Sequence, residues 1–578
     1  MRFLQSIFLL LSFTIFAQNN NKYITCFEKG NGNQSANYQE TISFYKLLDQ
    51  NFESIKMEKM GLTDSGEPLH IVTFNAGKNF DFKKIHQNKI VILINNSIHA
   101  GEPDGIDATM MLFRDLVLGK VQIPKNTIIV TIPVYNIGGA LNRNSTSRTN
   151  QNGPEEYGFR GNGRNFDLNR DLIKSDTENT KSFVDIFHRI NPEIFIDNHV
   201  SNGADYQYNL TYIQTQHNKL GTVLGEFMTQ KMTPAIVTDL KLKKQETTPY
   251  VNVWNGTPDK GFGQFSDSPR YTTGYTSLFN TIGYVVETHM LKSYAKRVQA
   301  TYDFMLSTIK YTDDNVLEIK MAISNNKTEF KKPNESYTIQ WVLDYSKVSK
   351  INFLGFEGLY KKSDVTSGQR LFYDQTKPYS KEIKYYPDFK ATKFITIPKA
   401  YIIPKGWWNV IELLKNNNCQ FYSLQKDTII EVECYRILDY KTSPTAYEGH
   451  YNHRNTTVSK TNQKVAFFKG DFVFKTSQPA IKYLLETLEP EAVDSFFNWN
   501  FFDTILQQKE GYSDYVFEDS ASKFLNENPN VKAELATKIK LEPDFAKNPE
   551  AQLEWVYKQS PHYEKAHLQY PVYRIMPR

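Results

Sequence analysis

The stretch that decides the fold is Ile90-Val-Ile-Leu-Ile94 followed by Asn95-Asn-Ser-Ile-His-Ala-Gly-Glu-Pro-Asp-Gly105. A short, uninterrupted apolar run predicts a buried strand, and the Gly-, Pro- and Asp-rich segment after it predicts a turn. His99 and Glu102 therefore sit together at a strand exit. Zn²⁺ accepts both side chains, and catalytic zinc sites commonly take three protein ligands. The pair alone does not identify a metal site, because a chain with eleven histidines can contain His-x-x-Glu by chance.

Strand-like and helix-like segments alternate from about residue 37 to residue 312. This alternation predicts an α/β fold with a mixed, mainly parallel twisted sheet and helices on both faces. The predicted strands are 71–74, 90–94, 127–133, 194–196 and 284–286, and the predicted helices are 104–118, 176–190, 218–232 and 292–310. In open α/β sheets ligands bind at the carboxyl ends of the strands. The His99/Glu102 turn is expected at that edge.

The rest of the chain has a different composition. Residues 313–338 are polar and predict a linker, and short runs rich in Tyr, Phe, Ile and Val beyond it predict a β-rich region with one helix at 407–415. We expect an N-terminal domain at 18–315, a β-rich accessory domain at 316–475 and a mixed segment at 476–578 that could pack on it. Three cysteines exclude a disulfide scaffold but allow a bond between Cys419 and Cys434.

The length, charge and N-terminus limit the class of protein. A chain of 578 residues is too long for a single core. Its net charge of +5 is small, and the basic residues are spread out, so no nucleic-acid partner is expected. Met1-Arg2 and the apolar residues 3–17 predict a signal peptide and a periplasmic or extracellular protein. No later segment has the roughly 18 apolar residues of a membrane span, and the oligomeric state is left open.

Two more residues lie at predicted strand exits. His199 follows the apolar run Ile194-Phe-Ile196, and Asp197 beside it could orient a ligand imidazole. Glu287 ends the run Gly283-Tyr-Val-Val286. A buried acid needs a partner or a role, and a pKa raised by burial would suit a general base. Taken alone, His199 is better interpreted as a core or surface histidine, and Glu287 could equally be a salt-bridged or solvent-facing strand end. The occurrence of His199 together with His99 and Glu102 at the same sheet edge reverses the first preference.

Arginine and asparagine are concentrated at 141–150 and 159–171. Arginines among Gly and Asn in a long loop can bind a carboxylate or an oxyanion through paired hydrogen bonds. For Arg143 and Arg164, taken singly, a solvated loop is the better interpretation. Two histidines near the C-terminus, His450 and His453, have no acid at ligand spacing, so a structural or surface role is favoured over a second metal site. The aromatic cluster 496–502 is expected in a core.

The order of these residues resembles that of a known family. His99-Ala-Gly-Glu102, Asp167-Leu-Asn-Arg-Asp171, His199 and Glu287 occur as in zinc metallocarboxypeptidases of the carboxypeptidase A-like superfamily. The similarity covers about residues 37–312, so the chain resembles a secreted bacterial-type member with a long C-terminal extension. The resemblance implies one Zn²⁺ held by His99, Glu102 and His199, and Glu287 as the base that activates the metal-bound water.

The resemblance also implies roles in substrate binding. Asn169 and Arg170 would hold the terminal carboxylate of the substrate, and an earlier arginine would stabilise the oxyanion. Arg148 is the first choice for that role and Arg160 the second. A loop tyrosine would fold over the substrate, and Tyr271 and Tyr275 both qualify. The short interval between Arg170 and His199 departs from the pancreatic-type enzymes and predicts trimmed or rebuilt specificity loops.

Three functions are compatible with these residues. The first is an exported zinc metallopeptidase that hydrolyses C-terminal peptide bonds. The second keeps the zinc chemistry and acts as an amidase or deacylase on N-acyl amino acids or cell-wall peptides. The third is a non-catalytic peptide-binding protein on the same scaffold, which the complete set of ligands and base argues against. The expected substrate is a peptide or a small amide.

Overall fold

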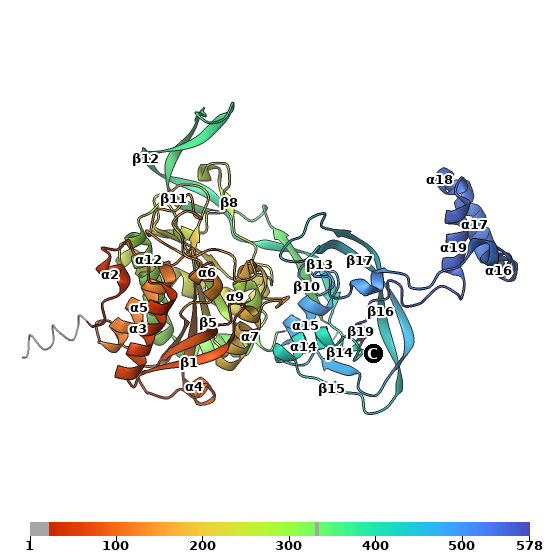
Figure 1. Ribbon diagram of the computed structural model, residues 1–578, viewed down its shortest axis with the longest axis horizontal. Helices are drawn as coiled ribbons and strands as arrows, with labels where there is room; N and C mark the ends of the chain where they lie inside the picture. Colours follow the sequence, from red (N-terminus) through yellow and green to blue (C-terminus); the bar gives the residue numbers. More distant parts are fainter. Residues whose placement is uncertain (1–21, 330–334, 578) are drawn as a thin grey trace, which may run out of the picture.

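The computed structural model describes residues 22–329 and 335–577, so the predicted signal peptide at 1–17 lies outside the described residues. Figure 1 shows a lobe built on a large sheet, coloured red to green, next to a second, β-rich lobe in cyan. A group of helices at the end of the chain projects beyond the second lobe. In the part of the chain that is described, no helix has both the length and the apolar character needed to cross a membrane.

The first lobe contains an eight-stranded sheet in the order β1-β2-β4-β3-β5-β9-β6-β7. The central strands β4, β3, β5 and β9 are parallel to one another, whereas the pairs β1–β2, β2–β4 and β6–β9 are antiparallel. The strands are β1 Ile55–Leu62, β2 Pro68–Phe74, β3 Ile90–Asn96, β4 Thr127–Ile132, β5 Ile194–Ser201, β6 Leu210–Gln214, β7 Thr247–Pro249 and β9 Ile282–His289. The mixed, mainly parallel sheet predicted from the alternating pattern is confirmed.

Helices cover both faces of this sheet. Successive strand residues point to opposite faces, and on β5 Asn198 contacts Met305 of α12 while Asp197 contacts Thr272 of α11. The helices of this lobe are α2 Cys26–Lys29, α3 Tyr38–Asn51, α4 Phe82–Asn88, α5 Asp104–Val117, α6 Ile137–Leu141, η1 Leu168–Arg170, α7 Glu178–Ile190, α8 His217–Leu220, α9 Thr222–Phe227, η2 Met228–Met232, α10 Thr233–Leu242, η3 Pro258–Lys260, α11 Thr272–Ser277, α12 Tyr294–Asp314 and α13 Val316–Asn326.

Two predicted segments differ from the structure. The helix expected at 218–232 is interrupted at Gly221, whose φ of 113° separates α8 from α9. Helix α13 occupies residues 316–326 of the polar linker expected at 313–338. Its apolar residues Val316, Ile319 and Ile323 recur at helical spacing and are buried. This periodicity outweighs the polar composition, because a helix needs only one apolar face.

The second lobe is rich in β-structure, as predicted. A long hairpin, β11–β12, stands at the top of Figure 1 and joins β8 of the first lobe, and a six-stranded sheet has the order β15-β18-β14-β19-β16-β17. In the first lobe, β8 is Phe262–Gly263. The remaining strands are β10 Ser336–Leu343, β11 Ser349–Lys362, β12 Gln369–Tyr386, β13 Phe389–Thr396, β14 Ala400–Ile403, β15 Tyr422–Ser423, β16 Thr428–Thr442, β17 His453–Phe467, β18 Phe472–Lys475 and β19 Tyr573–Ile575.

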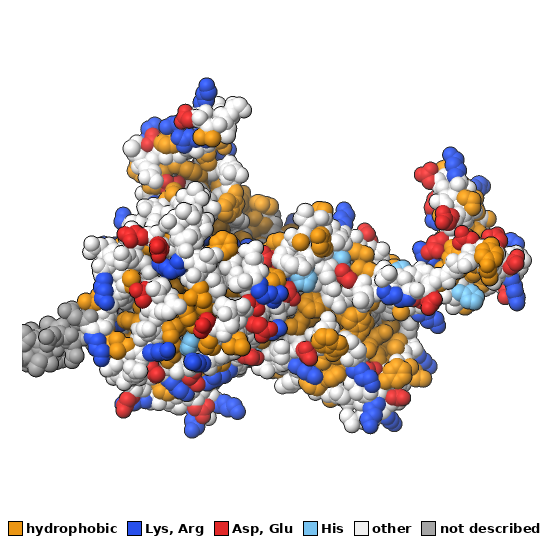
Figure 2. Space-filling view, viewed as in Figure 1, with side chains coloured by type: hydrophobic (Ala, Val, Ile, Leu, Met, Phe, Trp, Pro, Cys, Tyr) orange, Lys and Arg blue, Asp and Glu red, His pale blue; other side chains and the backbone are white. Residues whose placement is uncertain are grey.

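Helices accompany the second lobe and continue past it. They are α14 Trp408–Asn416, α15 Ile481–Leu488, η4 Asp503–Leu506, α16 Asp514–Glu527, α17 Pro529–Leu541, α18 Pro543–Ala546 and α19 Pro549–Gln559. The last four project as a separate group (Figure 2). Their small core includes Phe517 and Tyr557. The thiols of Cys419 and Cys434 are both buried and unpaired.

The two lobes share one hydrophobic core. Tyr275 and Phe279 of the first lobe pack against Tyr483 of α15, which in turn contacts Phe496. The aromatic cluster at 496–502 is buried here, as predicted: Phe496, Phe497, Trp499 and Phe502 are each at most 1% exposed. The C-terminal half is thus packed directly against the lobe that carries the candidate site.

Candidate active site

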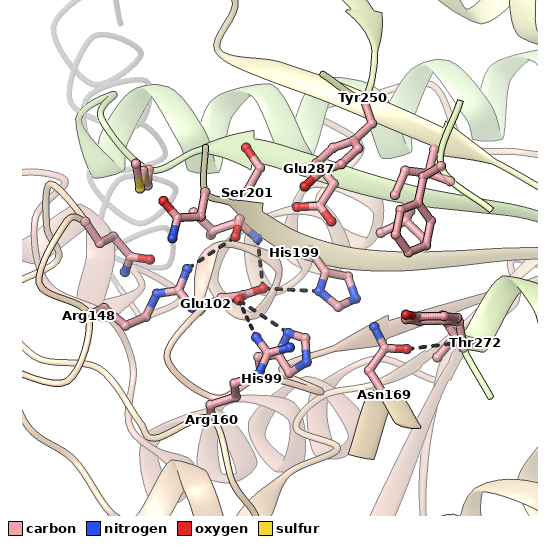
Figure 3. Close-up of a pocket in the computed structure, with 18 of the residues that line it drawn as sticks. His99, Glu102, Arg148, Arg160, Asn169, His199, Ser201, Tyr250, Thr272 and Glu287 are labelled. Atoms are coloured by element: carbon pink, nitrogen blue, oxygen red, sulfur yellow. Dashed lines mark hydrogen bonds and ion pairs between the residues drawn. The ribbon is translucent and has the colours of Figure 1, made fainter. Parts of the chain in front are cut away.

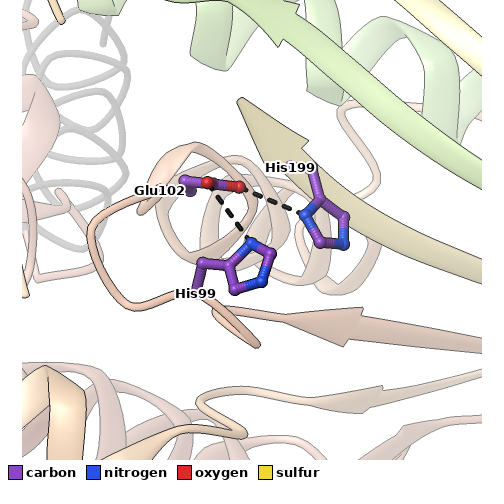
Figure 4. A group of neighbouring side chains, drawn as sticks. All are labelled: His99, Glu102 and His199. Carbon is purple, nitrogen blue, oxygen red and sulfur yellow. Dashed lines mark hydrogen bonds and ion pairs between the residues drawn. The ribbon is translucent and has the colours of Figure 1, made fainter. Parts of the chain in front are cut away.

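Three side chains converge at the carboxyl ends of β3 and β5. His99 and Glu102 lie in the turn after β3, and His199 lies on β5. His99 Nδ1 is 3.3 Å from Glu102 Oε1, and His199 Nδ1 is 3.1 Å from Glu102 Oε2 (Figure 4). All three residues are buried, and one potential ligand atom from each lies within 4.8 Å of the others. Parallel pairing of β3 with β5 brings the two strand exits together.

A carboxylate holds the second nitrogen of each imidazole. His99 Nε2 is 3.0 Å from Asp167 Oδ1, and His199 Nε2 is 2.9 Å from Asp197 Oδ2. Metal-binding histidines are commonly oriented by such a carboxylate, which fixes the tautomer and raises the basicity of the ligand nitrogen. Both Nδ1 atoms are thereby left to face Glu102.

The arrangement fits a zinc ion. Two ligands about 2.0–2.1 Å from a tetrahedral metal are roughly 3.3 Å apart, which agrees with the two Nδ1–carboxylate distances of 3.3 and 3.1 Å. His99 Nδ1 is buried and makes no hydrogen bond among the described residues, as expected for an atom reserved for a metal. Burial opposes ionisation of Glu102, but Arg148 and the two histidines outweigh it and hold the pKa of Glu102 well below its usual range.

A cavity of about 490 Å³ opens over these residues. Glu287, on β9 beside His199, lines it and is partly exposed (Figure 3). Its carboxylate makes no hydrogen bond within the described chain. Burial raises the pKa of Glu287 to about 7, with Glu102 and Asp197 adding to the effect and His199 opposing it. A carboxylate with such a pKa can exchange a proton near neutral pH.

Arg148 and Arg160 reach the cavity from the predicted Arg/Asn loops. Arg148 Nη1 is 2.7 Å from Glu102 Oε1, and its Nη2 donates to the carbonyl of Val200 at 3.2 Å. Arg160 binds Asp167 Oδ2 through Nε and Nη2, and its Nη1 is 3.7 Å from Glu102 Oε1. Two guanidinium groups therefore border the candidate metal ligands.

Asn169, Arg170 and Tyr271 line the same cavity. Asn169 Oδ1 accepts a hydrogen bond from the backbone N–H of Thr272 at 3.3 Å. The Arg170 guanidinium lies over the Tyr271 ring at 4.5 Å from its centroid, and its Nη1 donates to the Asn169 carbonyl. These contacts place an amide and a cation side by side on one wall.

The profile of the Peptidase_M14 family, described as zinc carboxypeptidase, matches residues 41–255. The chain carries a zinc carboxypeptidase domain. Its enzyme class is that of the zinc metallocarboxypeptidases, which are hydrolases. The match contains His99, Glu102 and His199 and ends before Glu287, which β9 of the same sheet carries.

Individual relatives are distant. A carboxypeptidase 2 from Trichophyton equinum is 19% identical over 454 residues, which are 75% of this chain and 78% of the relative. A metallo-carboxypeptidase structure from Burkholderia cenocepacia has 13% identity and a TM-score of 0.36, covering 48% of this chain and 70% of its own. One from Pseudomonas aeruginosa, in complex with (2-guanidinoethylmercapto)succinic acid, has 12% identity and a TM-score of 0.37, covering 49% and 70%.

Tyr275 does not line the cavity of the carboxypeptidase domain. This placement corrects the expectation that Tyr275 could cover the substrate. Tyr275 is fully buried on α11, and its hydroxyl donates to Asn417 Oδ1 at 2.6 Å. Tyr271 precedes the helix, whereas Tyr275 lies one turn inside it on the core-facing side. The sequence of this short helix does not reveal which side faces the core, because all six of its residues are small or amphipathic.

Several residues of the carboxypeptidase cavity were not anticipated. Tyr250 and Trp254 line it from the segment after β7, and Asp267 and Thr273 line it before β9. Asp167 was recognised only as part of a motif, yet it orients His99 and binds Arg160. The one signal for Tyr250 is that a second aromatic residue, Trp254, follows it closely in a loop-like segment. The motif did not indicate these contacts, since the partners of Asp167 lie 68 and 7 residues away.

Proposed function

We propose that the protein is an exported zinc-dependent peptidase that hydrolyses C-terminal peptide bonds. The observation that carries this proposal is the convergence of His99, Glu102 and His199 beneath a cavity that Glu287 also enters. The catalytic domain would comprise residues 18–315, followed by an accessory domain at 316–475 and the segment at 476–578. Export rests on the predicted signal peptide at 1–17, with a periplasmic or extracellular destination.

His99, Glu102 and His199 would hold one metal ion. Bound Zn²⁺ would supply a Lewis acid that polarises the scissile carbonyl and lowers the pKa of a water molecule to about 7. Asp167 and Asp197 keep the two imidazoles in the tautomer whose Nδ1 carries no proton. Their negative charge also makes both nitrogens stronger ligands.

Glu287 would act as the general base. Its carboxylate accepts a proton from the attacking water and later delivers that proton to the leaving amine. A pKa of about 7 suits both transfers, because the group is neither fully ionised nor fully protonated near neutral pH. Arg148, with Arg160 beside it, would support the negative charge that develops on the carbonyl oxygen. Losing one such donor typically costs about 10²–10³ in rate.

Asn169 and Arg170 would bind the free carboxylate at the end of the substrate. A guanidinium presents paired donors that match a carboxylate, and the Asn169 carbonyl and the Tyr271 ring hold Arg170 in place. Tyr271 would then cover the bound residue. A binding site for the terminal carboxylate supports exopeptidase over endopeptidase action.

The test compares peptides that differ only at their C-termini. Peptides with a free carboxylate should lose their last residue, whereas the same peptides with a C-terminal amide should be poor substrates. Preferential hydrolysis of N-acyl amino acids or muropeptides would favour the amidase or deacylase alternative. Peptide binding without any hydrolysis by zinc-loaded protein would instead favour the non-catalytic alternative.

A further inference from the structure

We propose that the C-terminal half completes the active site through Glu448, a positioning residue that acts on His99 by way of Asp167. The proposal rests on the metal site described under the proposed function. It assigns a role to a region for which the sequence predicted only an accessory fold. Glu448 does not line the catalytic cavity, so its effect must pass through another residue.

Glu448 lies at the tip of a tight turn between β16 and β17. Tyr447 and His450 are paired through both of their backbone hydrogen bonds, at 2.7 and 3.1 Å. The two residues between them, Glu448 and Gly449, both have positive φ, at 49° and 79°. Glycine accepts this conformation readily, but for a glutamate it is uncommon and costs free energy. The turn therefore holds Glu448 in a backbone conformation that glutamate does not favour by itself.

The carboxylate of Glu448 reaches the first lobe. Its Oε2 accepts a hydrogen bond from the backbone N–H of Asp167 at 2.8 Å, across 281 residues of sequence. Asp167 in turn directs Oδ1 to His99 Nε2 at 3.0 Å and Oδ2 to the Arg160 guanidinium at 2.8 Å. Fixing the backbone at Asp167 thus fixes the carboxylate that orients a candidate metal ligand.

Neighbouring contacts hold the turn in register with this loop. His450 Nε2 lies 2.7 Å from Asp176 Oδ2, which also binds Lys174 at 2.7 Å. Gly449 lies against the Phe166 ring so closely that a Cβ there would come within 3.2 Å of it. Phe166 is the residue just before Asp167. Gly449 and His450 therefore hold the turn against the segment that contains Asp167. His450 has the structural role that its sequence context favoured.

A second contact from the C-terminal half holds another loop that lines the cavity. Asp494 accepts hydrogen bonds from the backbone N–H and the Nε of Arg270, at 3.0 and 2.8 Å. The Arg270 guanidinium also lies over the Trp499 ring, 4.9 Å from its centroid. Arg270 immediately precedes Tyr271, which supports Arg170. The C-terminal half thus contacts the loop that orients His99 and the loop that supports the carboxylate-binding arginine.

The experiment uses the full chain with two substitutions at Glu448. Asparagine tolerates positive φ, so Glu448→Asn keeps the turn but shortens the side chain by one methylene and loses the contact. Glu448→Gln keeps the length and an oxygen that can accept the hydrogen bond from Asp167. Glu431→Asn is the matched control, because Glu431 is an exposed residue of β16 in the same lobe.

The readouts are zinc affinity by chelator competition, thermal unfolding, and kcat and KM for a peptide that the wild type cleaves. Removing a residue that orients a metal ligand typically weakens metal binding by about 10–100-fold. Glu448 acts on His99 through Asp167 and is therefore one step further from the metal. Glu448→Asn should weaken zinc binding by about tenfold, the lower end of that range. Its kcat should fall more than its KM rises. Glu448→Gln and Glu431→Asn should retain wild-type zinc affinity.

Three outcomes would count against the positioning role, and one of them would also overturn the proposed function. Equal zinc affinity and kcat in Glu448→Asn and Glu431→Asn would remove the positioning role while leaving the proposed function intact. A wild-type protein that binds no zinc would overturn the proposed function, and the positioning role with it. A lower unfolding temperature in Glu448→Asn with unchanged zinc affinity would show that the contact serves stability alone, and would also overturn the proposal.

Discussion

Asp197 and His199 are two residues apart on β5, and their side chains are in contact: Asp197 Oδ2 lies 2.9 Å from His199 Nε2. The same oxygen accepts a hydrogen bond from Thr272 Oγ1 at 2.7 Å. Residues two apart on a strand point to the same face, so the strand itself places the carboxylate behind the imidazole. Thr272 then fixes the carboxylate from the neighbouring helix.

The first prediction concerns this pair. Asp197→Asn keeps the shape of the side chain but removes the charge that makes His199 a strong ligand. Zinc affinity should fall by about 10–100-fold, the usual effect of losing such a partner, as measured by chelator competition. Asp185→Asn, at an exposed position of α7, is the control. Unchanged affinity in Asp197→Asn would mean that His199 does not need the carboxylate to bind metal.

The second prediction separates metal binding from catalysis. Glu287→Gln should bind zinc as the wild type does, because the side chain lies outside the group of three ligands. Its kcat/KM should fall by about 10²–10⁴, since an amide cannot accept the proton of water. His99→Ala should lose zinc as well as activity. Full activity in zinc-loaded Glu287→Gln would exclude Glu287 as the base.

The third prediction concerns the terminal carboxylate. Arg170→Gln should raise KM for peptides with a free C-terminus by roughly 10–100-fold, since a hydrogen bond to a charged group contributes about 1.5–3 kcal/mol. Peptides with a C-terminal amide should be affected far less. Arg164→Gln, in the same loop but half exposed, should leave both kinds of substrate unchanged. A comparable rise in KM for both kinds would remove Arg170 from carboxylate recognition.

The fourth prediction is a pH dependence of stability that arises away from the metal site. Asp107 is buried on α5, where it accepts hydrogen bonds from the Tyr294 hydroxyl and the Ala36 N–H. Burial raises the pKa of Asp107 to about 7 from an ordinary value of 3.8. Between these two values the folded protein keeps a proton that the unfolded chain has released, so the free energy of unfolding decreases as pH rises.

Comparison with Asp107→Asn isolates this contribution. The stability of the wild type relative to the variant should decline between about pH 4 and pH 7 and level off above, by at most roughly 4 kcal/mol. Denaturant unfolding at a series of pH values measures the difference directly. If the difference stays constant across that range, Asp107 does not retain its proton in the folded protein.

The sequence could predict the residues whose positions follow from a strand. His99, His199 and Glu287 each follow an apolar run, and parallel pairing of the runs brings their ends together. It could not predict contacts made between distant segments. The hydrogen bond from Asp167 to Glu448 joins two loops whose approach depends on packing of the lobes, and nothing near either residue signals the other.

Tyr271 and Tyr275 illustrate the same limit over a short distance, because only three residues and the start of α11 separate a cavity residue from a core residue. The fifth prediction follows from that difference. Tyr271→Ala should raise KM with little effect on stability, since Arg170 loses the ring beneath it. Tyr275→Phe should leave kcat and KM unchanged but lower the free energy of unfolding by about 1–3 kcal/mol. The cause is that Asn417 Oδ1 loses a buried donor at the contact between the lobes. Steady-state kinetics and denaturant unfolding of both variants give the comparison, and a change in KM for Tyr275→Phe would contradict the placement of that residue in the core.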